Sequence, residues 1–441
     1  MVEFNTDQKY FKEYSLKLIF QNVVMGLMMS ADKIIASMFI GVNALVATNL
    51  IGPMQLMIYA VSTLLMSGLG SYVGLLIGQG KIDKANRTSS AVLILLTGII
   101  SIVTLLVITF PSEIAYFVGA RGEVLHLTKD YLFYVSWGFI PMVVASAIDV
   151  LIMNDGSPGF IMKVNIVSTI LNLFLNIVFV AYFNLGIVGL AVATTISNLI
   201  HLVTSGYYFV TKCTTLKLVK PSISTKVLFR IVYNGTSDFL GMFSEGLKRY
   251  VINIAIITFL TPKHMEAYAI VSMFIIIFVS SVFYGTALGL QPIFSKMMGA
   301  MHYDRLKPLL NYSVKNSNYI ALTIFVLAVP FLKPVLGLFS NDLETINIGF
   351  YIYLTFGFAT LFENLPNAVI MFFTAINRPI ESVVFSVTRT VILLPCLTYF
   401  SVYAFGASGL MLGTLFAEII MIMLCYKYLN GIDFTKMQIV E

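Results

Sequence analysis

The chain has 441 residues, of which 58% are hydrophobic and 11% are charged, and its formal net charge is +6 at pH 7. Soluble proteins carry about 25% charged residues, so this composition excludes a water-soluble globular enzyme and indicates an all-α integral membrane protein. The excess positive charge lies in short segments between apolar stretches, which is typical of a membrane-topology signal and argues against a nucleic-acid partner.

The first apolar stretch, residues 15–41, is long enough to cross a bilayer, yet it contains Asp32 and Lys33. A carboxylate in the middle of a span costs about 2.5–3.5 kcal/mol. Adjacent residues of a helix point in different directions, so Lys33 is a poor partner for Asp32. We therefore consider Asp32 a candidate functional residue. The alternative is a structural charge that neutralises a neighbour or lies at a wet helix end.

Met28 falls on or near the helical face of Asp32, together with Met25 and Met29. Flexible methionine surfaces suit varied apolar ligands, which makes Met28 a candidate substrate contact. Lipid contact is the alternative, and it is the commoner role in an apolar chain with 22 methionines.

Apolar stretches bounded by polar, Gly or Pro breaks predict twelve transmembrane helices. Their ranges are 16–40, 53–78, 90–110, 127–152, 161–183, 188–211, 231–260, 267–295, 313–335, 346–375, 382–404 and 409–428. Lys and Arg gather in the segments that face the cytoplasm if the N-terminus is inside. The positive-inside rule then predicts a multi-pass protein of the cell (inner) membrane with both termini in the cytoplasm.

The two halves of the sequence are internal repeats. An offset of 221 residues pairs Gly68 with Gly289, Gly78 with Gly299, Asp83 with Asp304 and Pro158 with Pro379. At an offset of 220 residues, the segment 185–197 matches the segment 405–417. Six spans, an even number, separate equivalent points, so the two halves should run in the same direction across the membrane.

The repeat predicts two six-helix bundles related by an axis along the membrane normal, with the working cavity between them. We expect an N-lobe of residues 1–211, a cytoplasmic linker of 212–230 and a C-lobe of 231–441. Such an arrangement suits a transporter that rocks two lobes around a central site.

Polar residues at helical spacing follow in spans five and six. Asn172 and Asn176 are four residues apart and share a face, as do Thr194 and Asn198. With Asp32 they would offer one carboxylate among amide and hydroxyl oxygens, which suits a monovalent cation or a proton. The alternative is that each of them only hydrogen-bonds helices together.

The second half has its own charged stripe. Glu245, Arg249 and Asn253 are spaced by four on span seven, and Glu363 lies beside the helix-kinking Pro366 on span ten. A binding role and a structural Glu245–Arg249 ion pair are both open. The remaining charges inside spans are Asp149, Arg389 and Glu418.

Several motifs are missing from the sequence. It contains no Walker motif, no HExxH and no Cys/His cluster, so ATP-driven transport and metallo-hydrolysis have no support. The four histidines lie far apart in the sequence and receive no role.

At this point the chain resembles the multidrug and toxic compound extrusion (MATE) family along nearly its whole length. The resemblance rests on the two six-span repeats, on Asp32 followed by Gly41, and on two motifs in spans five and six. The motifs read Asn172-Leu-Phe-Leu-Asn176-Ile and Gly186-Ile-Val-Gly189-Leu-Ala-Val-Ala-Thr194. The family has Asp-Pro where this chain has Asn176 and Ile177, which removes one charge. One bacterial branch has a Glu ten residues after the Gly that opens span seven, and Glu245 follows Gly235 at that spacing.

The resemblance implies a V-shaped, alternating-access antiporter that expels organic, cationic and amphipathic compounds and is not an enzyme. It implies a coupling-cation site at Asp32, Asn172, Asn176 and Thr194, for H⁺ or for Na⁺ at Asp32. Glu245, Glu363, Arg249, Asn253 and Met28 are the expected substrate contacts. The expected partners are a small organic substrate and the lipid bilayer, with no further cofactor, and the chain is expected to be a monomer.

Two alternatives remain open. A lipid-linked oligosaccharide flippase of the same superfamily should carry a strongly cationic cavity. A polytopic prenyl or acyl transferase should carry paired Asp or His in a cytoplasmic loop, whereas Asp83 and Asp304 are single and lie next to Lys84 and Arg305. A major-facilitator transporter shares the count of twelve spans, but its loop signature needs Gly-x-x-x-Asp-Arg.

Overall fold

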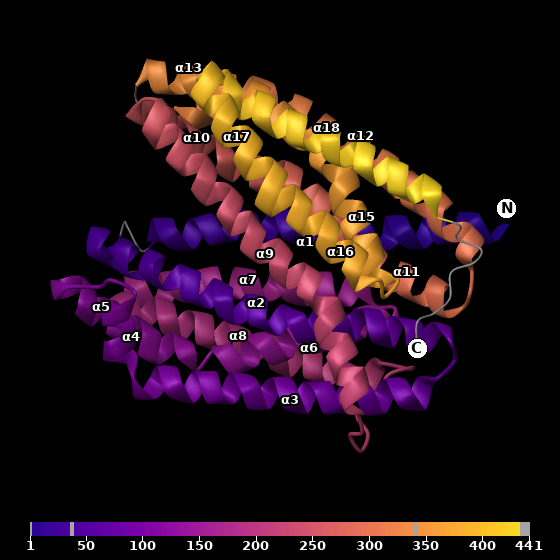
Figure 1. Ribbon diagram of the computed structural model, residues 1–441. Helices are drawn as coiled ribbons and strands as arrows, with labels where there is room; N and C mark the ends of the chain where they lie inside the picture. The colour runs from indigo at the N-terminus through magenta and orange to yellow at the C-terminus, as the bar shows by residue number, and fades with distance from the viewer. Residues whose placement is uncertain (1, 36–38, 338–341, 433–441) are drawn as a thin grey trace. The chain divides into compact units, whose positions relative to one another are not determined.

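The computed structural model describes residues 2–35, 39–337 and 342–432, and every regular element in them is a helix (Figure 1). In the first half these are α1 (Val2–Ile35), α2 (Val42–Gly78), α3 (Ile82–Thr109), α4 (Pro111–Phe117), α5 (Gly122–Ser136), α6 (Phe139–Asp155), α7 (Pro158–Asn176), the π-helix η2 (Ile177–Tyr182) and α8 (Gly186–Lys212). The second half begins with α9 (Thr225–Phe259), α10 (Pro262–Ile275), η3 (Ile276–Ser280), α11 (Ser281–Gly299) and α12 (Tyr303–Leu336). It continues with α13 (Leu343–Ile352), η4 (Tyr353–Gly357), α14 (Phe358–Thr360), η5 (Leu361–Glu363), α15 (Asn364–Ala375), α16 (Pro379–Val387), η6 (Thr388–Leu393), α17 (Leu394–Phe405) and α18 (Ser408–Gly431).

The helices have the length and composition of membrane spans. Among the described residues, eight helical segments are long and apolar enough to cross a bilayer, and the pair α5–α6, bent by 45°, makes a ninth. Large apolar side chains point outward, as on α3, where Ile102 and Leu105 are exposed. Such a surface suits lipid rather than water. An all-α membrane fold is therefore confirmed, while the count of twelve spans stays a prediction that these helices fit.

The internal repeat is visible in the backbone. Three pairs of turn residues adopt positive φ at the sequence offset of 220 or 221: Gly80 (72°) with Met301 (61°), Gly156 (111°) with Asn377 (58°), and Gly186 (57°) with Gly406 (58°). Non-glycine residues rarely adopt this conformation. Because Met301 and Asn377 adopt it nonetheless, each half must form the same tight turn at the same place.

The chain forms two compact units, and the boundaries between them fall within α1 and within α9, the first helix of each half. The N-terminal unit is Val24–Gly235, and the C-terminal unit is Met1–Val23 together with Thr236–Glu441. The N-terminal unit therefore includes the start of α9, and the C-terminal unit includes the start of α1. The lobe boundaries expected from the sequence, at 211 and 231, stay a prediction.

Glycines allow the starts of α1 and α9 to pack closely against their units. In the N-terminal unit, a Cβ atom added at Gly68 on α2 would lie 1.9 Å from the carbonyl oxygen of Ile231 on α9. In the C-terminal unit, a Cβ atom at Gly289 on α11 would lie 2.9 Å from Oγ of Ser15 on α1. Gly68 and Gly289 are the pair that the offset of 221 predicts, and both allow a second helix backbone to approach closely.

The segment after α8 is bound to the N-terminal unit. The Asp155 carboxylate at the end of α6 accepts hydrogen bonds from the backbone N–H groups of Thr214, Thr215 and Leu216, at 2.7–3.0 Å. Burial, followed by the charge of Asp155, raises the pKa of the adjacent Cys213 thiol to about 12. The first part of the predicted linker is thus fixed on one unit.

Candidate functional site

The first polar cluster lies between α7 and α8 in the N-terminal unit. We call Asn172, Asn176 and Thr194 the asparagine cluster. Asn172 Nδ2 donates to Thr194 Oγ1 at 3.3 Å, and Asn176 Nδ2 donates to Asn172 Oδ1 at 3.4 Å. Asn176 is buried and is followed directly by the π-helix η2. The structure therefore brings three of the four predicted coupling-site residues together.

Helix α1 passes close to this cluster. Ile35 packs in one apolar group with Val180 and Leu190, and Leu173, next to Asn172, packs against that group. Position 32 lies one turn before Ile35 on the same helix. The side chains of Asp32 and Met28 lie outside the described residues, so their predicted roles stay predictions.

Asn198 belongs to another contact. Its Nδ2 donates to the carbonyl oxygen of Gly138 at 3.4 Å, and Thr195 Oγ1 donates to the carbonyl oxygen of Tyr134 at 3.0 Å. Both carbonyls lie at the bend between α5 and α6, and the Gly138 carbonyl also accepts a hydrogen bond from the Met142 N–H at 3.0 Å. The two side chains of α8 thus hydrogen-bond the backbone of a neighbouring helix inside the membrane.

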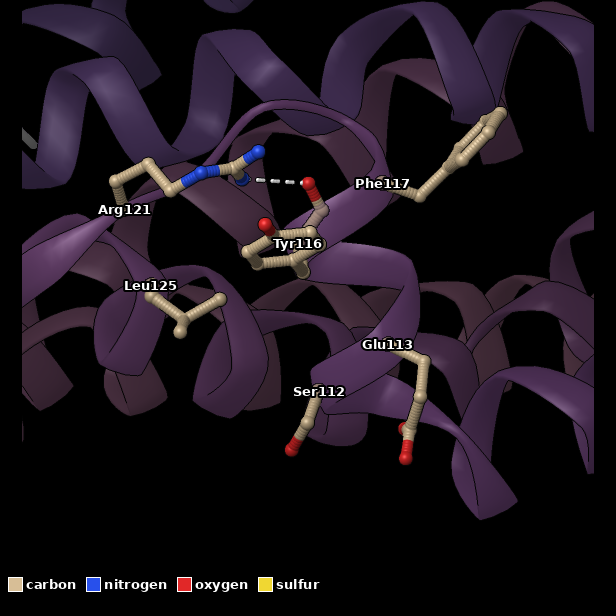
Figure 2. A pocket seen from close by; sticks show the side chains of 6 residues that line it. All are labelled: Ser112, Glu113, Tyr116, Phe117, Arg121 and Leu125. Atoms are coloured by element: carbon tan, nitrogen blue, oxygen red, sulfur yellow. Dashed lines mark hydrogen bonds between the residues drawn. The ribbon is translucent and has the colours of Figure 1, made fainter.

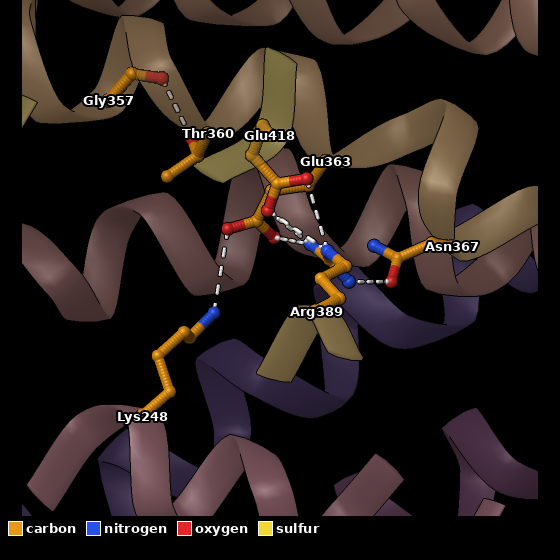
Figure 3. Close-up of polar contacts among 7 residues, drawn as sticks. All are labelled: Lys248, Gly357, Thr360, Glu363, Asn367, Arg389 and Glu418. Carbon is orange, nitrogen blue, oxygen red and sulfur yellow. Dashed lines mark hydrogen bonds and ion pairs between the residues drawn. The ribbon is translucent and has the colours of Figure 1, made fainter. Parts of the chain in front are cut away.

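The second cluster is a set of buried ion pairs in the C-terminal unit (Figure 3). Arg389 on η6 makes a two-pronged contact with Glu418 on α18: Nε lies 2.9 Å and Nη2 2.8 Å from Oε1. Arg389 Nη1 donates to Asn367 Oδ1 at 2.5 Å. Glu363 lies 3.6 Å from Arg389 and 3.5 Å from Lys248 Nζ on α9. We call Lys248, Glu363, Arg389 and Glu418 the ion-pair network.

The network pairs two cationic with two anionic side chains. All four are buried or nearly so, with side-chain exposures of 12% for Lys248, 8% for Glu363, 5% for Arg389 and 0% for Glu418. Buried charges of this kind are tolerated only when they are paired and hydrogen-bonded. Glu363, a predicted substrate contact, thus lies between the cations Lys248 and Arg389 and is not an isolated charge.

The other residues expected around this site are described only in part. The side chains of Glu245 and Arg249 lie outside the described residues, and Asn253 is half-buried on α9. Their substrate roles stay predictions.

A third polar cluster, which the sequence patterns above do not predict, surrounds Asp149 on α6. Asp149 accepts hydrogen bonds from Ser205 Oγ at 2.8 Å and Asn165 Nδ2 at 3.1 Å, and its Oδ2 lies 2.9 Å from His201 Nε2. Asp149, His201 and Ser205 are all buried. A histidine four residues before a serine on span six, with an unpaired Asp on span four, was the signal that could have found it.

A surface hollow of about 630 Å³ opens beside α4 (Figure 2). It is lined by Ser112, Glu113, Tyr116, Phe117, Arg121 and Leu125. The Arg121 guanidinium lies 3.6 Å from the centre of the Tyr116 ring and donates to the Tyr116 carbonyl oxygen at 2.7 Å. This cation thus fixes the turn after α4, and we assign the hollow no ligand.

A match to a protein-family model identifies the family of this chain. The model, MatE, matches residues 18–178 and again residues 239–400. The chain belongs to the MatE family. The two matched segments of this MATE transporter begin 221 residues apart (239 minus 18), which confirms the repeat found in the sequence.

Relatives and solved structures agree with the family. The multidrug export protein MepA of Staphylococcus aureus is 24% identical, over 84% of this chain and 82% of its own length. An FAD transporter of Shewanella oneidensis is 25% identical, over 88% and 86%. The fold matches a mutant of the Vibrio cholerae MATE transporter VcmN with a TM-score of 0.91 at 16% identity, over 99% and 100% of the two chains. It matches a MATE in complex with MaL6 with a TM-score of 0.89 at 19% identity, over 96% and 97%.

Membership in the MATE family removes two alternatives. MATE proteins are transporters and not enzymes, so the prenyl or acyl transferase is excluded. The major-facilitator assignment is excluded for the same reason. The chain is a multi-pass membrane transport protein.

Proposed function

We propose that this MATE protein is a secondary active exporter of small organic compounds that works by antiport with H⁺ or Na⁺. The observation that carries the proposal is the match over more than four fifths of its length to relatives named for multidrug export and for FAD transport. In this proposal it lies in the cell membrane as a monomer with both termini in the cytoplasm.

The coupling cation would bind in the N-terminal unit. The asparagine cluster contains amide and hydroxyl oxygens within one hydrogen-bonded group, and hard cations prefer oxygen ligands. In this model Asp32 supplies the negative charge, because the family acid of span five is Asn176 here. Binding of the cation would repack α1 and release the substrate.

The substrate would bind in the C-terminal unit. Glu245 and Glu363 would attract a cationic, amphipathic compound, with Arg249 and Asn253 as further contacts on α9. Met28 belongs to the N-terminal unit and stays an expected apolar contact. Because Glu363 is paired with Lys248 and Arg389, a cationic substrate would have to compete with these side chains. The relative named as an FAD transporter makes a flavin nucleotide a second candidate substrate.

The test uses everted membrane vesicles with a fluorescent cationic dye or FAD added outside, so that export appears as uptake into the lumen. A pH gradient and a sodium gradient are imposed separately. We expect one gradient to drive export of at least one compound, and Asp32→Asn to abolish it, while Asp130→Asn, which removes an exposed carboxylate, leaves it intact.

Two outcomes would contradict the proposal. Movement of neither compound under either gradient would favour the flippase. Gradient-driven export that survives in Asp32→Asn would remove Asp32 from coupling.

A further inference from the structure

Asp149 lies at the centre of the third cluster. Its carboxylate accepts hydrogen bonds from the Ser205 hydroxyl and the Asn165 amide N–H, and its Oδ2 lies 2.9 Å from Nε2 of His201. The two donors favour the charged form of the carboxylate. With Asp149 charged, Nε2 of His201 donates to it, and Nδ1 is the ring nitrogen that gains or loses a proton.

The charge of the pair changes by one when a proton binds. With a neutral imidazole, Asp149 and His201 together carry a net charge of minus one inside a span. One added proton at Nδ1 gives an imidazolium–carboxylate pair with net charge zero. The low dielectric constant of this buried place makes the two states electrostatically very different.

The surrounding helices supply few competing charges. Tyr59 on α2 lies within electrostatic range of Asp149. In the described part of α3, α5 and α7, the acidic, basic and histidine side chains are exposed, whereas Asp149 is buried. Described α2 contains none. The protonation state of the pair thus dominates the charge at this level of the unit.

The pair is also placed to affect the asparagine cluster. Asn165 and Asn172 are seven residues apart on α7, and Thr194 and His201 are seven residues apart on α8. Seven residues are two helical turns, a rise of about 10.5 Å. The same two helices therefore carry two polar layers: Asn165 with His201 around Asp149, and Asn172 with Thr194.

We propose that Asp149 and His201 form a proton-binding site inside the N-terminal unit, and that its occupancy sets the pH dependence of transport. Proton binding and release change the attraction between α6 and α8, and α8 carries Thr194 of the asparagine cluster. The second half of this proposal rests on the transport function proposed above.

Proton binding is tested directly on the purified full chain in lipid nanodiscs. The chain has four histidines, so ring-labelled histidine gives an NMR spectrum simple enough to titrate, and His201→Gln identifies the His201 signal. We expect that signal to change with pH, and we expect Asp149→Asn to alter this response, because a neutral amide does not stabilise the imidazolium as a carboxylate does. The signal of the exposed His126 should be the same in Asp149→Asn as in the unmodified chain at each pH. A His201 signal that does not titrate, or that Asp149→Asn does not move, overturns the proposal.

The role in transport is tested on vesicles at a series of pH values. The inflection in the initial rate of export should be lost in His201→Gln and kept in the matched control His126→Gln. An inflection that persists in His201→Gln overturns the proposal. Size-exclusion profiles check that each variant folds. If the unmodified chain exports nothing, the function proposed above fails, and the NMR titration alone still decides whether the proton site exists.

Discussion

Arg389 and Glu418 are the most deeply buried ion pair among the described residues of the C-terminal unit, with side-chain exposures of 5% and 0%. Both charges have lost their contact with solvent. The two-pronged geometry and the bond from Arg389 to Asn367 offset part of this desolvation. Removing one partner leaves the other charge buried and unpaired, which costs more than the pair itself contributes.

Arg389→Gln should therefore strongly destabilise the protein. We expect a loss of about 3–5 kcal/mol in the free energy of unfolding, because Glu418 is left uncompensated. The matched control is Arg378→Gln, which breaks the more exposed pair with Glu381 at 3.1 Å and should cost at most about 1 kcal/mol. Thermal unfolding of the purified variants measures both. Equal losses of unfolding free energy in the two variants would show that burial of the ion pair does not determine its effect on stability.

A second step separates charge from packing. The double substitution Arg389→Met with Glu418→Met removes both charges and keeps apolar volume. It should recover most of the stability that Arg389→Gln loses. A double variant as unstable as the single one would contradict the explanation by unpaired charge.

At the scale of elements, Asp155 fixes the segment after α8. Its carboxylate accepts hydrogen bonds from three backbone N–H groups, and burial, followed by the charge of this carboxylate, raises the pKa of Cys213. Asp155→Ala should release this segment, expose Cys213 and remove the charge that disfavours its thiolate. The rate of maleimide labelling at pH 8 should then rise by about tenfold or more, since thiolate is the reactive form.

The labelling is measured in a background with Cys396→Ala and Cys425→Ala, so that Cys213 is the only thiol. Asp130→Ala, which removes an exposed carboxylate elsewhere in the same unit, serves as the control. Rapid labelling of Cys213 before Asp155 is changed would mean that the segment is not docked.

The close approach of α2 and α9 depends on Gly68. A methyl group there would collide with the Ile231 carbonyl, so Gly68→Ala should cost about 1–3 kcal/mol as the helices shift apart. Gly98→Ala on α3 is the control, because nothing lies within 4 Å of its added Cβ atom. Alanine at that position should be neutral or stabilising by up to about 1 kcal/mol. The difference in melting temperature between the two variants measures the effect, and its absence would refute the close contact.

Irregular helices mark the limit of what the sequence reveals. Spacing by four placed Asn172 and Asn176 on one face, where they are hydrogen-bonded. The same spacing paired Thr194 with Asn198, but only Thr194 bonds to Asn172, and Asn198 bonds to the Gly138 carbonyl. The partner of Arg389 could not be found in this way. Arg389 lies in the π-helix η6, which shifts the faces of span eleven relative to a regular helix. His201 and Ser205 share a face of α8 by their spacing of four, but spacing within one helix does not show that this face lies against Asp149 on α6.

At the scale of the whole molecule, the repeat could be predicted from the sequence, but the helices that pack on its paired glycines could not. Equal offsets in sequence predicted equal turns, and Met301 and Asn377 confirm them. The pairing of Gly68 with Gly289 showed that both positions needed a small residue. It did not show that the neighbour is the first helix of the other half, because periodicity identifies a buried face and not what covers it.

Each unit contains the start of the first helix of the other half of the sequence. This arrangement predicts how the chain behaves when it is expressed as two fragments. A break between Ser222 and Ile223 keeps the Asp155 contacts within the first fragment. It keeps the start of α9, where the Ser224 hydroxyl accepts a hydrogen bond from the Val227 N–H, within the second fragment. Each compact unit then consists of parts of both fragments. We expect the two co-expressed fragments to co-purify through a tag on one of them, because neither unit is complete without the start of α1 or of α9. Gly68→Ala in the first fragment should lower the yield of the complex, while Gly98→Ala should not. Fragments that fold and purify separately, without binding each other, would contradict the division into these two units.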